Sequence, residues 1–182
     1  MLQGANINAE YRSPEVDEDK EKLDFKGSCL DLALYLSKLK ALSVKEKDAY
    51  IIGCDQVCEL EGEVINKGGD FENSKKILQR MQDKQHFQNT AMAIVLNNKV
   101  VFEYKFISKL TMKPLSAEEI TEYLHKDTPF YCAGSYKLEE NGRSLFSKIE
   151  GRDDCIQGFP LKALQEFLKK NNKKLKKTKI RC

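Results

Sequence analysis

The sequence predicts an α/β or α+β fold in which helices cover a mixed β-sheet. The chain has 182 residues, of which 41% are hydrophobic and 32% charged, and this balance is typical of one globular domain of ordinary size. Segments with strand character alternate along the chain with segments of helical periodicity. Because strands and helices are interleaved rather than grouped, a mixed sheet with helices packed on it is the expected architecture.

The first third of the chain is expected to hold one helix and one strand. Residues 1–27 are mostly polar and predict no element of their own. Ser28 is a suitable N-cap for a helix over about 29–42, whose leucines and alanines form one apolar stripe. The segment 50–58 begins with apolar and β-branched residues, which predicts a buried strand that ends at a Gly and an Asp.

The middle of the chain is expected to form a helix and two hairpins. Asp70 is placed to cap the helix. Asn97-Asn98 lies between two segments of strand character, which predicts a hairpin turn, and alternation in the second segment predicts one wetter face. The elements expected here are a hairpin turn at 61–63, a helix over 71–82, and strands over 87–96 and 100–112.

The last third is expected to contain two helices separated by irregular structure. Ser116 and Glu119 have the spacing of a capping box, so a helix is expected to run from there to about Lys126. The Gly-punctuated segment 130–159 predicts short strands and loops. Pro160 suits the first position of a helix over 160–170, whose leucines and phenylalanine form a buried stripe.

Basic residues are concentrated at the end of the chain. Residues 169–182 contain eight Lys or Arg and no acidic residue, and since the whole chain carries +3, residues 1–168 carry −5. We therefore expect one domain over 1–168 and a basic, disordered tail over 169–182. The acidic body argues against a specific nucleic-acid surface, which would spread Lys and Arg over the folded part. Binding of nucleic acid or an anionic membrane by the tail alone is the alternative.

Several classes of protein are disfavoured by what the sequence lacks. No apolar run approaches the ~20 residues of a membrane helix, and the first residues do not have the pattern of a signal peptide. We therefore expect a cytoplasmic protein with no membrane partner. The six Cys form no CxxC pair and the two His do not follow them at zinc spacing, so we expect buried thiols in a reducing compartment and no structural zinc.

Four charged residues are candidates for chemistry. Asp55 lies at the expected end of a buried strand, which is where open α/β sheets bind ligands. The alternative is that Asp55 caps a helix or a turn, since Asp after Gly is common in turns. Asp55 and one other acid could hold a hard divalent ion that substrate phosphates complete, and Glu18 is one of several acids in a charged stretch. Lys67 could bind an anion, and Glu139 could accept hydrogen bonds from the N–H groups of a guanine-like base. For the last three residues an exposed surface charge is the alternative.

Seven segments, in their order and spacing, resemble the Maf family of nucleoside triphosphate pyrophosphatases. The resemblance covers roughly residues 13–168. Its segments are PEVDE at 14–18, residues 36–41, IIGCDQV at 51–57, residues 62–67, the expected helix at 116–124, AGSY at 133–136 and GFPL at 158–161.

Two positions resemble the family branch that hydrolyses 7-methyl-GTP. Gln56 follows Asp55, where the branch acting on dTTP and UTP typically has Thr. Glu139 stands where that other branch has Gln. The segments DQVC at 55–58, GSYKLE at 134–139, LF at 145–146 and IEGRD at 149–153 are similar to the 7-methyl-GTP branch as well.

The resemblance implies an activity and three residue roles. The reaction would be hydrolysis of 7-methyl-GTP between its α- and β-phosphates, giving 7-methyl-GMP and diphosphate. By residue-by-residue correspondence, Asp55 would be the proton acceptor that activates water. Gln56 and Glu139 would select the base.

The resemblance also implies a phosphate and metal region and a fold. Glu18, Lys40 and Lys67 would line this region, and a divalent cation, Mg or Mn, would be held by Asp55 and Glu18. Such a cation and the Lys charges would offset the charge that develops on the phosphates. The implied fold is an α/β, Maf/ITPase-like mixed twisted sheet in two lobes with a nucleotide cleft between them. Members of the family are often dimeric, so a homodimer is an expected assembly.

One segment of the family pattern is absent from this sequence. The family opens with a strand and a Ser-x-Ser-x-Arg turn that binds phosphates, and the resemblance begins beyond them. Arg12-Ser13-Pro14 lies just before Val16-Asp17-Glu18, whereas the family's turn lies a full helix earlier. We therefore expect either a start codon further upstream or a catalytically impaired nucleotide-binding relative. A dTTP/UTP pyrophosphatase of the same family is the other alternative.

Overall fold

The structure is a computed structural model that describes residues 7–171 and the backbone of residues 179–181. The tail expected at 169–182 therefore lies outside the described residues except for 169–171 and that short backbone segment. Among the described residues, no helix is long and apolar enough to cross a membrane.

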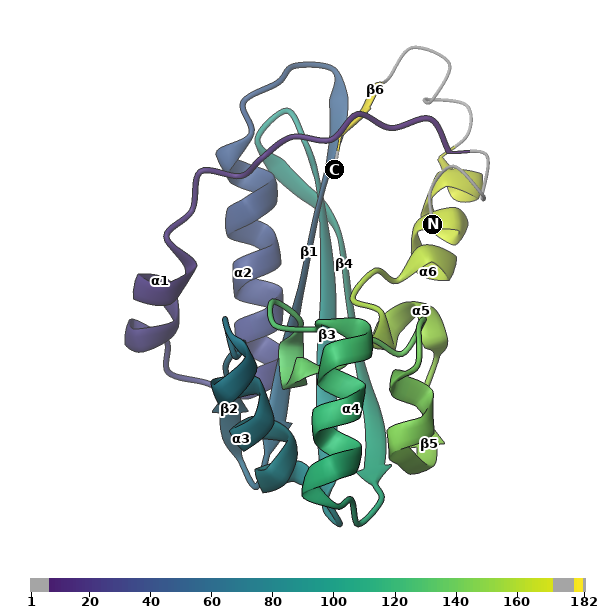
Figure 1. The fold of residues 1–182 in the computed structure, drawn as a ribbon. Coiled ribbons are helices and arrows are strands. Elements are labelled where there is room, and N and C mark those ends of the chain that lie inside the picture. Colours follow the sequence, from purple (N-terminus) through teal and green to yellow (C-terminus); the bar gives the residue numbers. More distant parts are fainter. Residues whose placement is uncertain (1–6, 172–178, 182) are drawn as a thin grey trace. The chain divides into compact units, whose positions relative to one another are not determined.

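The strands form a mixed sheet, as the sequence predicts (Figure 1). Within the described residues its order is β2-β1-β3-β4-β5, and β6 pairs with β1 off this path. β2 and β5 pair antiparallel with β1 and β4, whereas β6 runs parallel to β1. The strands are β1 (Ala49–Leu60), β2 (Glu63–Ile65), β3 (Gln85–Leu96), β4 (Lys99–Met112), β5 (Phe146–Glu150) and β6 (Lys179–Arg181).

Side-chain caps start most of the longer helices where the sequence places them. Ser28 accepts a hydrogen bond from the backbone of Asp31, Asp70 accepts one from Asn73, and Ser116 forms the complete capping box. The helices are α1 (Glu18–Asp24), α2 (Cys29–Ser43), α3 (Phe71–Met81), α4 (Ala117–Asp127), α5 (Asp153–Ile156) and α6 (Leu161–Lys170), with 3₁₀ turns η2 (Ala133–Ser135) and η3 (Gly142–Leu145).

Three expectations about these elements are wrong in detail. α1, capped by Asp17, lies in the segment where no element was predicted. Pro160 is the N-cap of α6 rather than its first helical residue. β1 does not end at Gly53 or Asp55 but continues to Leu60, so Asp55 lies inside a strand.

Gly53 lies within β1 because of close packing, not because it breaks the strand. A Cβ at this position would be 2.1 Å from the backbone oxygen of Ser37 and 2.9 Å from the backbone nitrogen of Ala41. Both atoms belong to α2. Glycine therefore lets the helix backbone approach the strand backbone more closely than any side chain would allow.

The chain divides into two compact units, in keeping with the two lobes expected. Unit 1 comprises the chain up to Asp55, Thr90–Phe106 and the chain from Gly158 onward, and unit 2 comprises Gln56–Asn89 and Ile107–Gln157. β1, β3 and β4 each contribute residues to both units.

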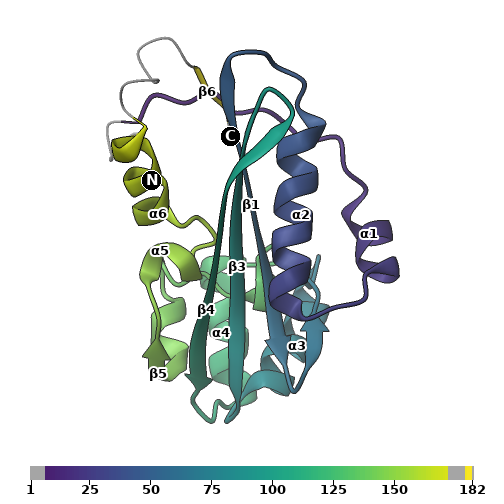
Figure 2. The same ribbon diagram turned by 180° about the vertical axis from the view of Figure 1, so that it is seen from behind.

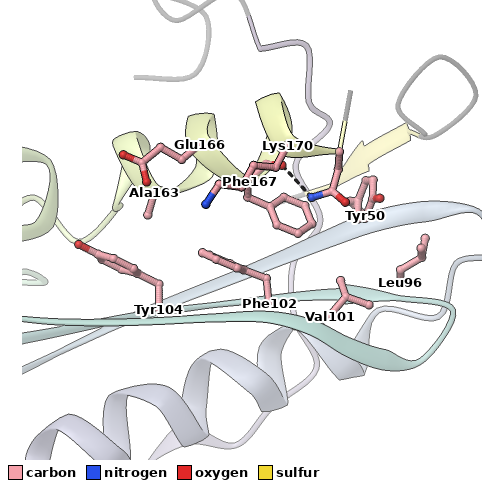
Figure 3. Close-up of a pocket in the computed structure, with 10 residues that line it drawn as sticks. Tyr50, Leu96, Val101, Phe102, Tyr104, Ala163, Glu166, Phe167 and Lys170 are labelled. Carbon is pink, nitrogen blue, oxygen red and sulfur yellow. Dashed lines mark hydrogen bonds between the residues drawn. The ribbon is translucent and has the colours of Figure 1, made fainter. Parts of the chain in front are cut away.

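In unit 1, β1 and β3 are buried on both faces, by α2 on one side and α6 on the other (Figure 2). Tyr50 and Ile52 pack with Phe167 of α6, and the Tyr50 and Phe167 rings meet edge to face at 5.3 Å between centroids (Figure 3). Ile51 faces the other way and packs with Ala41 of α2. This explains why β1 begins as a continuous apolar run.

In unit 2, α3 and α4 pack against each other over a core that includes the second half of β1 (Figure 1). Its fully buried side chains include Leu60 of β1, Leu78 and Met81 of α3, and Ile120 and Leu124 of α4.

A histidine is buried in this second core. His86 has no exposed surface, and its Nε2 lies 3.1 Å from the hydroxyl of Tyr136. Gln88 Nε2 donates to the same hydroxyl at 2.8 Å, and the His86 ring packs against Phe146 at 5.7 Å between centroids. Burial lowers the pKa of His86 from 6.5 to about 4.

This histidine makes stability depend on pH. Between pH 6.5 and pH 4 the unfolded chain binds a proton on His86 that the folded chain does not, so acid favours unfolding. We expect the free energy of unfolding, relative to His86→Gln, to fall by about 3 kcal/mol over this range. The measurement is urea unfolding of both proteins at several pH values. A difference between them that stays constant over this range would contradict the assignment.

Candidate active site

Three of the predicted site residues meet in unit 1. Lys40 of α2 donates a hydrogen bond from Nζ to Glu18 Oε1 of α1 at 2.9 Å, and also donates to Asp55 Oδ1 of β1. The three groups therefore form a carboxylate–ammonium–carboxylate cluster on three separate elements.

The local sequence explains how α2 and β1 bring this pair together. Asp55 lies two residues after Gly53, so the two share one face of β1. At Gly53 the strand touches the α2 backbone at Ser37 and Ala41. Lys40 lies within that same turn of helix, and the close approach places its ammonium against Asp55.

The cluster is mostly withdrawn from solvent. The exposed fractions of the Asp55, Lys40 and Glu18 side chains are 8%, 17% and 27%. Loss of hydration raises the pKa of Asp55, and Lys40 offsets only part of that effect. Burial opposes the charge on Lys40, but the two carboxylates outweigh it and raise the pKa of Lys40. Lys40 therefore stays protonated, and Asp55 is a stronger base than an exposed carboxylate.

A cavity of about 750 Å³ lies beside the cluster in unit 1. Glu18 and Lys40 line it together with apolar residues of β1 and Phe159. Arg12 and Ser13 line it too, and sequence reasoning assigned them no role. Their distance from Glu18 in the sequence does not indicate that they line the same cavity. They reach it because of the path that the chain takes before α1.

Gln56, the next residue along β1, is held within unit 2. Its Nε2 donates to the backbone oxygens of Cys155 at 2.9 Å and Ile156 at 2.8 Å. These bonds fix the side chain against the short helix α5. Asp55 and Gln56 are adjacent in the strand, so their side chains leave it on opposite faces.

Lys67 and Glu139 are exposed residues of unit 2. Lys67 follows β2, and Glu139 lies between the two 3₁₀ turns. Burial raises the pKa of the half-buried Cys132 thiol and Lys137 lowers it, while the charges of Glu139 and Lys67 have smaller and opposite effects on it.

The Gly134-Ser135 segment approaches other parts of unit 2 closely. A Cβ on Gly134 would lie 2.9 Å from the Tyr136 ring and 3.1 Å from Cys58 Sγ of β1. Gly134 and Ser135 both have positive φ, 76° and 56°. The segment is a 3₁₀ turn packed on β1, so its close contacts are with residues of the protein itself.

The acidic residues fit a cation site only if a ligand contributes to it. Within the described residues, no group of three or more His, Cys, Asp or Glu is arranged to hold a metal ion. Glu18 and Asp55 nevertheless converge on one ammonium group, so both carboxylates reach the same point. Hard divalent cations are commonly held by one or two carboxylates with phosphates and water completing the shell. The donor set fits such a cation.

The chain is similar to known proteins along most of its length. A family model described as Maf-like protein matches residues 1–171. The chain is 35% identical over 176 residues to a nucleoside triphosphate pyrophosphatase of Pelagibacter ubique, covering 93% of this chain and 90% of the relative. It is 40% identical over 162 residues to a 7-methyl-GTP pyrophosphatase of Bdellovibrio bacteriovorus, covering 88% and 85%. A 7-methyl-GTP pyrophosphatase of Brucella suis is 32% identical over 177 residues, covering 93% and 89%. The family match along nearly the whole chain and the identity to these relatives lead to one conclusion: this protein belongs to the Maf family.

Proposed function

We propose that this chain is a nucleoside triphosphate pyrophosphatase that hydrolyses 7-methyl-GTP to 7-methyl-GMP and diphosphate. The observation that carries the proposal is the buried Asp55 carboxylate, held by Lys40 beside a cavity of nucleotide-compatible size. Relatives named for pyrophosphatase activity match most of the chain and support the reaction class.

Asp55 has the properties of the group that activates water. Its raised pKa increases its basicity, and its burial limits competition from bulk solvent. In the proposed step a water molecule gives its proton to Asp55, and its oxygen attacks one of the two phosphorus atoms joined by the bridge between the α- and β-phosphates. The bond between that phosphorus and the bridging oxygen breaks, and the bridging oxygen leaves with the other product, so that the two products are 7-methyl-GMP and diphosphate.

Lys40 and Glu18 have supporting roles in this proposal. The Lys40 ammonium offsets negative charge that develops on the phosphates, and Glu18 fixes its position from the other side. A divalent cation, Mg or Mn, would be held by Asp55 and Glu18 and would supply further charge neutralisation to the phosphates. Lys67, exposed in unit 2, is proposed as another phosphate ligand.

Gln56 and Glu139 are proposed to select the base. A carboxylate accepts hydrogen bonds from the adjacent N–H groups on the Watson–Crick edge of a guanine-type base, and Glu139 is exposed and able to reach a ligand. Gln56 is held by α5, which gives it a fixed orientation. The names of the Bdellovibrio and Brucella relatives support 7-methyl-GTP as the substrate.

The role of Asp55 predicts a large kinetic effect. Asp55→Asn removes the proton acceptor but keeps the side-chain shape, so kcat should fall by at least about 100-fold. The control is Glu59→Gln, a carboxylate on the same strand that bonds to Asn89 and should leave kcat unchanged. Diphosphate release is the assay, with circular dichroism to confirm folding. Near-normal turnover by folded Asp55→Asn would remove Asp55 from this role, and no turnover by the unaltered protein would favour a nucleotide-binding relative.

The proposed cation predicts sensitivity to chelation. Treatment with EDTA should abolish diphosphate release, and added Mg or Mn should restore it, because without the cation the negative triphosphate would meet two carboxylates and only the one positive charge of Lys40. Glu18→Gln should raise the Mg concentration needed for half-maximal rate. Full activity in EDTA after exhaustive dialysis would contradict the metal assignment.

Base selection predicts a change in substrate preference. The unaltered protein should turn over 7-methyl-GTP with a higher kcat/KM than dTTP or UTP. Glu139→Gln should lower kcat/KM for 7-methyl-GTP at least about tenfold, because hydrogen bonds to a charged acceptor are the stronger kind. The neighbouring exposed Glu140, paired with Lys137, provides the control variant Glu140→Gln. Equal or better turnover of dTTP and UTP by the unaltered protein would identify the other branch.

A further inference from the structure

The loop that carries Glu139 is closed tightly on itself. It comprises residues 137–142, which follow η2 and lead into η3. Gly142 donates its backbone N–H to the backbone oxygen of Lys137 at 3.0 Å, and a Cβ on Gly142 would lie 2.3 Å from that oxygen. Leu138 is buried in the core of unit 2, whereas Glu139, the next residue, is exposed. Glu139 therefore lies at the surface of a short, compact segment.

The end of α4 holds both ends of this loop. Asp127, the last residue of α4, is only 2% exposed. Its Oδ2 accepts the backbone N–H of Asn141 at 3.0 Å, and its Oδ1 accepts Nδ2 of Asn141 at 2.6 Å. At the other end the Tyr123 hydroxyl accepts the backbone N–H of Lys137 at 2.9 Å, and Lys137 Nζ donates to the backbone oxygen of Asp127 at 2.8 Å. Glu139 lies between the two attachments in sequence.

Tyr123 and Asp127 also connect the two attachments to each other. Burial raises the pKa of the Tyr123 hydroxyl, the Lys137 N–H lowers it, and the charge of Asp127 and its hydrogen bond with the hydroxyl raise it. The hydroxyl therefore stays protonated and donates to Asp127 while it accepts from Lys137. One buried carboxylate thus lies at the centre of the contacts that hold both ends of the loop.

These attachments fix the loop backbone and leave the Glu139 side chain at the surface. Exposed loops are ordinarily mobile, and a mobile carboxylate must be ordered when a ligand binds to it. A carboxylate on a fixed backbone needs less ordering and accepts hydrogen bonds from a narrower range of ligand orientations. The loop is therefore suited to discriminate between ligands.

We propose that Asp127, assisted by Tyr123, is a positioning residue that determines substrate preference through the Glu139 loop. This inference rests on the base-selecting role proposed above for Glu139. Asp127 is buried and bonded to its own chain, so it acts on the base only through the position of Glu139. Loosening the loop should therefore lower kcat/KM for 7-methyl-GTP much more than kcat/KM for UTP. The ratio of these two kcat/KM values is the selectivity ratio.

The experiment exchanges the two side chains of the Asp127–Asn141 pair in the full chain. Asn141→Asp sets two carboxylates against each other in place of the 2.6 Å hydrogen bond, so the selectivity ratio should fall at least about fivefold. Adding Asp127→Asn restores an amide–carboxylate pair with the two positions reversed. The amide at 127 can then donate to the carboxylate at 141 and accept the backbone N–H of that residue. The double variant should return the ratio to within about twofold of the unaltered protein.

Asn73→Asp is the matched control. Asn73 bonds to Asp70 in the same manner, with its backbone N–H and its Nδ2 on the two carboxylate oxygens, at the exposed start of α3. This variant makes the same chemical change away from the loop and should leave the selectivity ratio unchanged. Hydrogen–deuterium exchange of peptides that cover 137–142 is the second measurement. Exchange should be faster in Asn141→Asp, and should have its original rate in the double variant and in the control.

A double-mutant cycle tests whether the effect acts through Glu139. In the Glu139→Gln background, Asn141→Asp should change the selectivity ratio by less than about twofold, because the group that the loop positions is already absent. A role in general stability would instead lower kcat/KM for both nucleotides by the same factor and leave the ratio unchanged. Circular dichroism checks that each variant is folded.

The two proposals can fail separately. The role of Asp127 is overturned if Asn141→Asp leaves the selectivity ratio unchanged or if the exchanged pair does not restore it. It is also overturned if the effects of Asn141→Asp and Glu139→Gln on the ratio multiply as independent effects would. If Glu139→Gln itself leaves the ratio unchanged, base selection by Glu139 is wrong, and the role of Asp127 in it is overturned as well.

Discussion

The missing side chain of Gly53 is the constraint on which the candidate site depends. It allows the α2 backbone to approach the β1 backbone within a distance that no Cβ would permit. One turn of α2 and two residues of β1 then bring Lys40 against Asp55, inside the first unit and away from water. Adding a methyl group at this position would separate the helix from the strand without touching either charged residue. A glycine with no chemistry of its own thus sets the geometry of the ions beside it.

Much of the fold was accessible from local patterns. Ser28, Asp70 and the Ser116–Glu119 box each begin a helix within a residue of the predicted start, because a cap is decided by a few neighbouring atoms. The Asn97-Asn98 hairpin was accessible for the same reason. α1 was missed because it is seven residues long, has no buried side chain and therefore shows no apolar stripe. The predicted end of β1 was too early. A glycine that ends a strand and a glycine that lets a helix pack closely on a strand cannot be distinguished in the sequence.

The candidate site was less accessible from spacing alone. Glu18, Lys40 and Asp55 lie on three elements, and no periodicity connects them, so their grouping came only from the family resemblance. Nothing in the sequence indicated that Arg12 and Ser13 share a cavity with them. Glu139 and Lys67 are exposed in unit 2. For such residues the sequence does not distinguish a charge that only faces solvent from one that contacts a ligand.

The ion cluster also has an electrostatic consequence for ligand binding. With all three groups ionised, two carboxylates and one ammonium carry a net charge of −1, held where screening by water is weak. A triphosphate that entered this region would meet a like charge, and the proposed cation would remove it. The proposed nucleotide and cation would then be thermodynamically linked ligands, each raising the affinity of the protein for the other by the same factor. Such a cluster would favour binding of the two together over binding of either one alone.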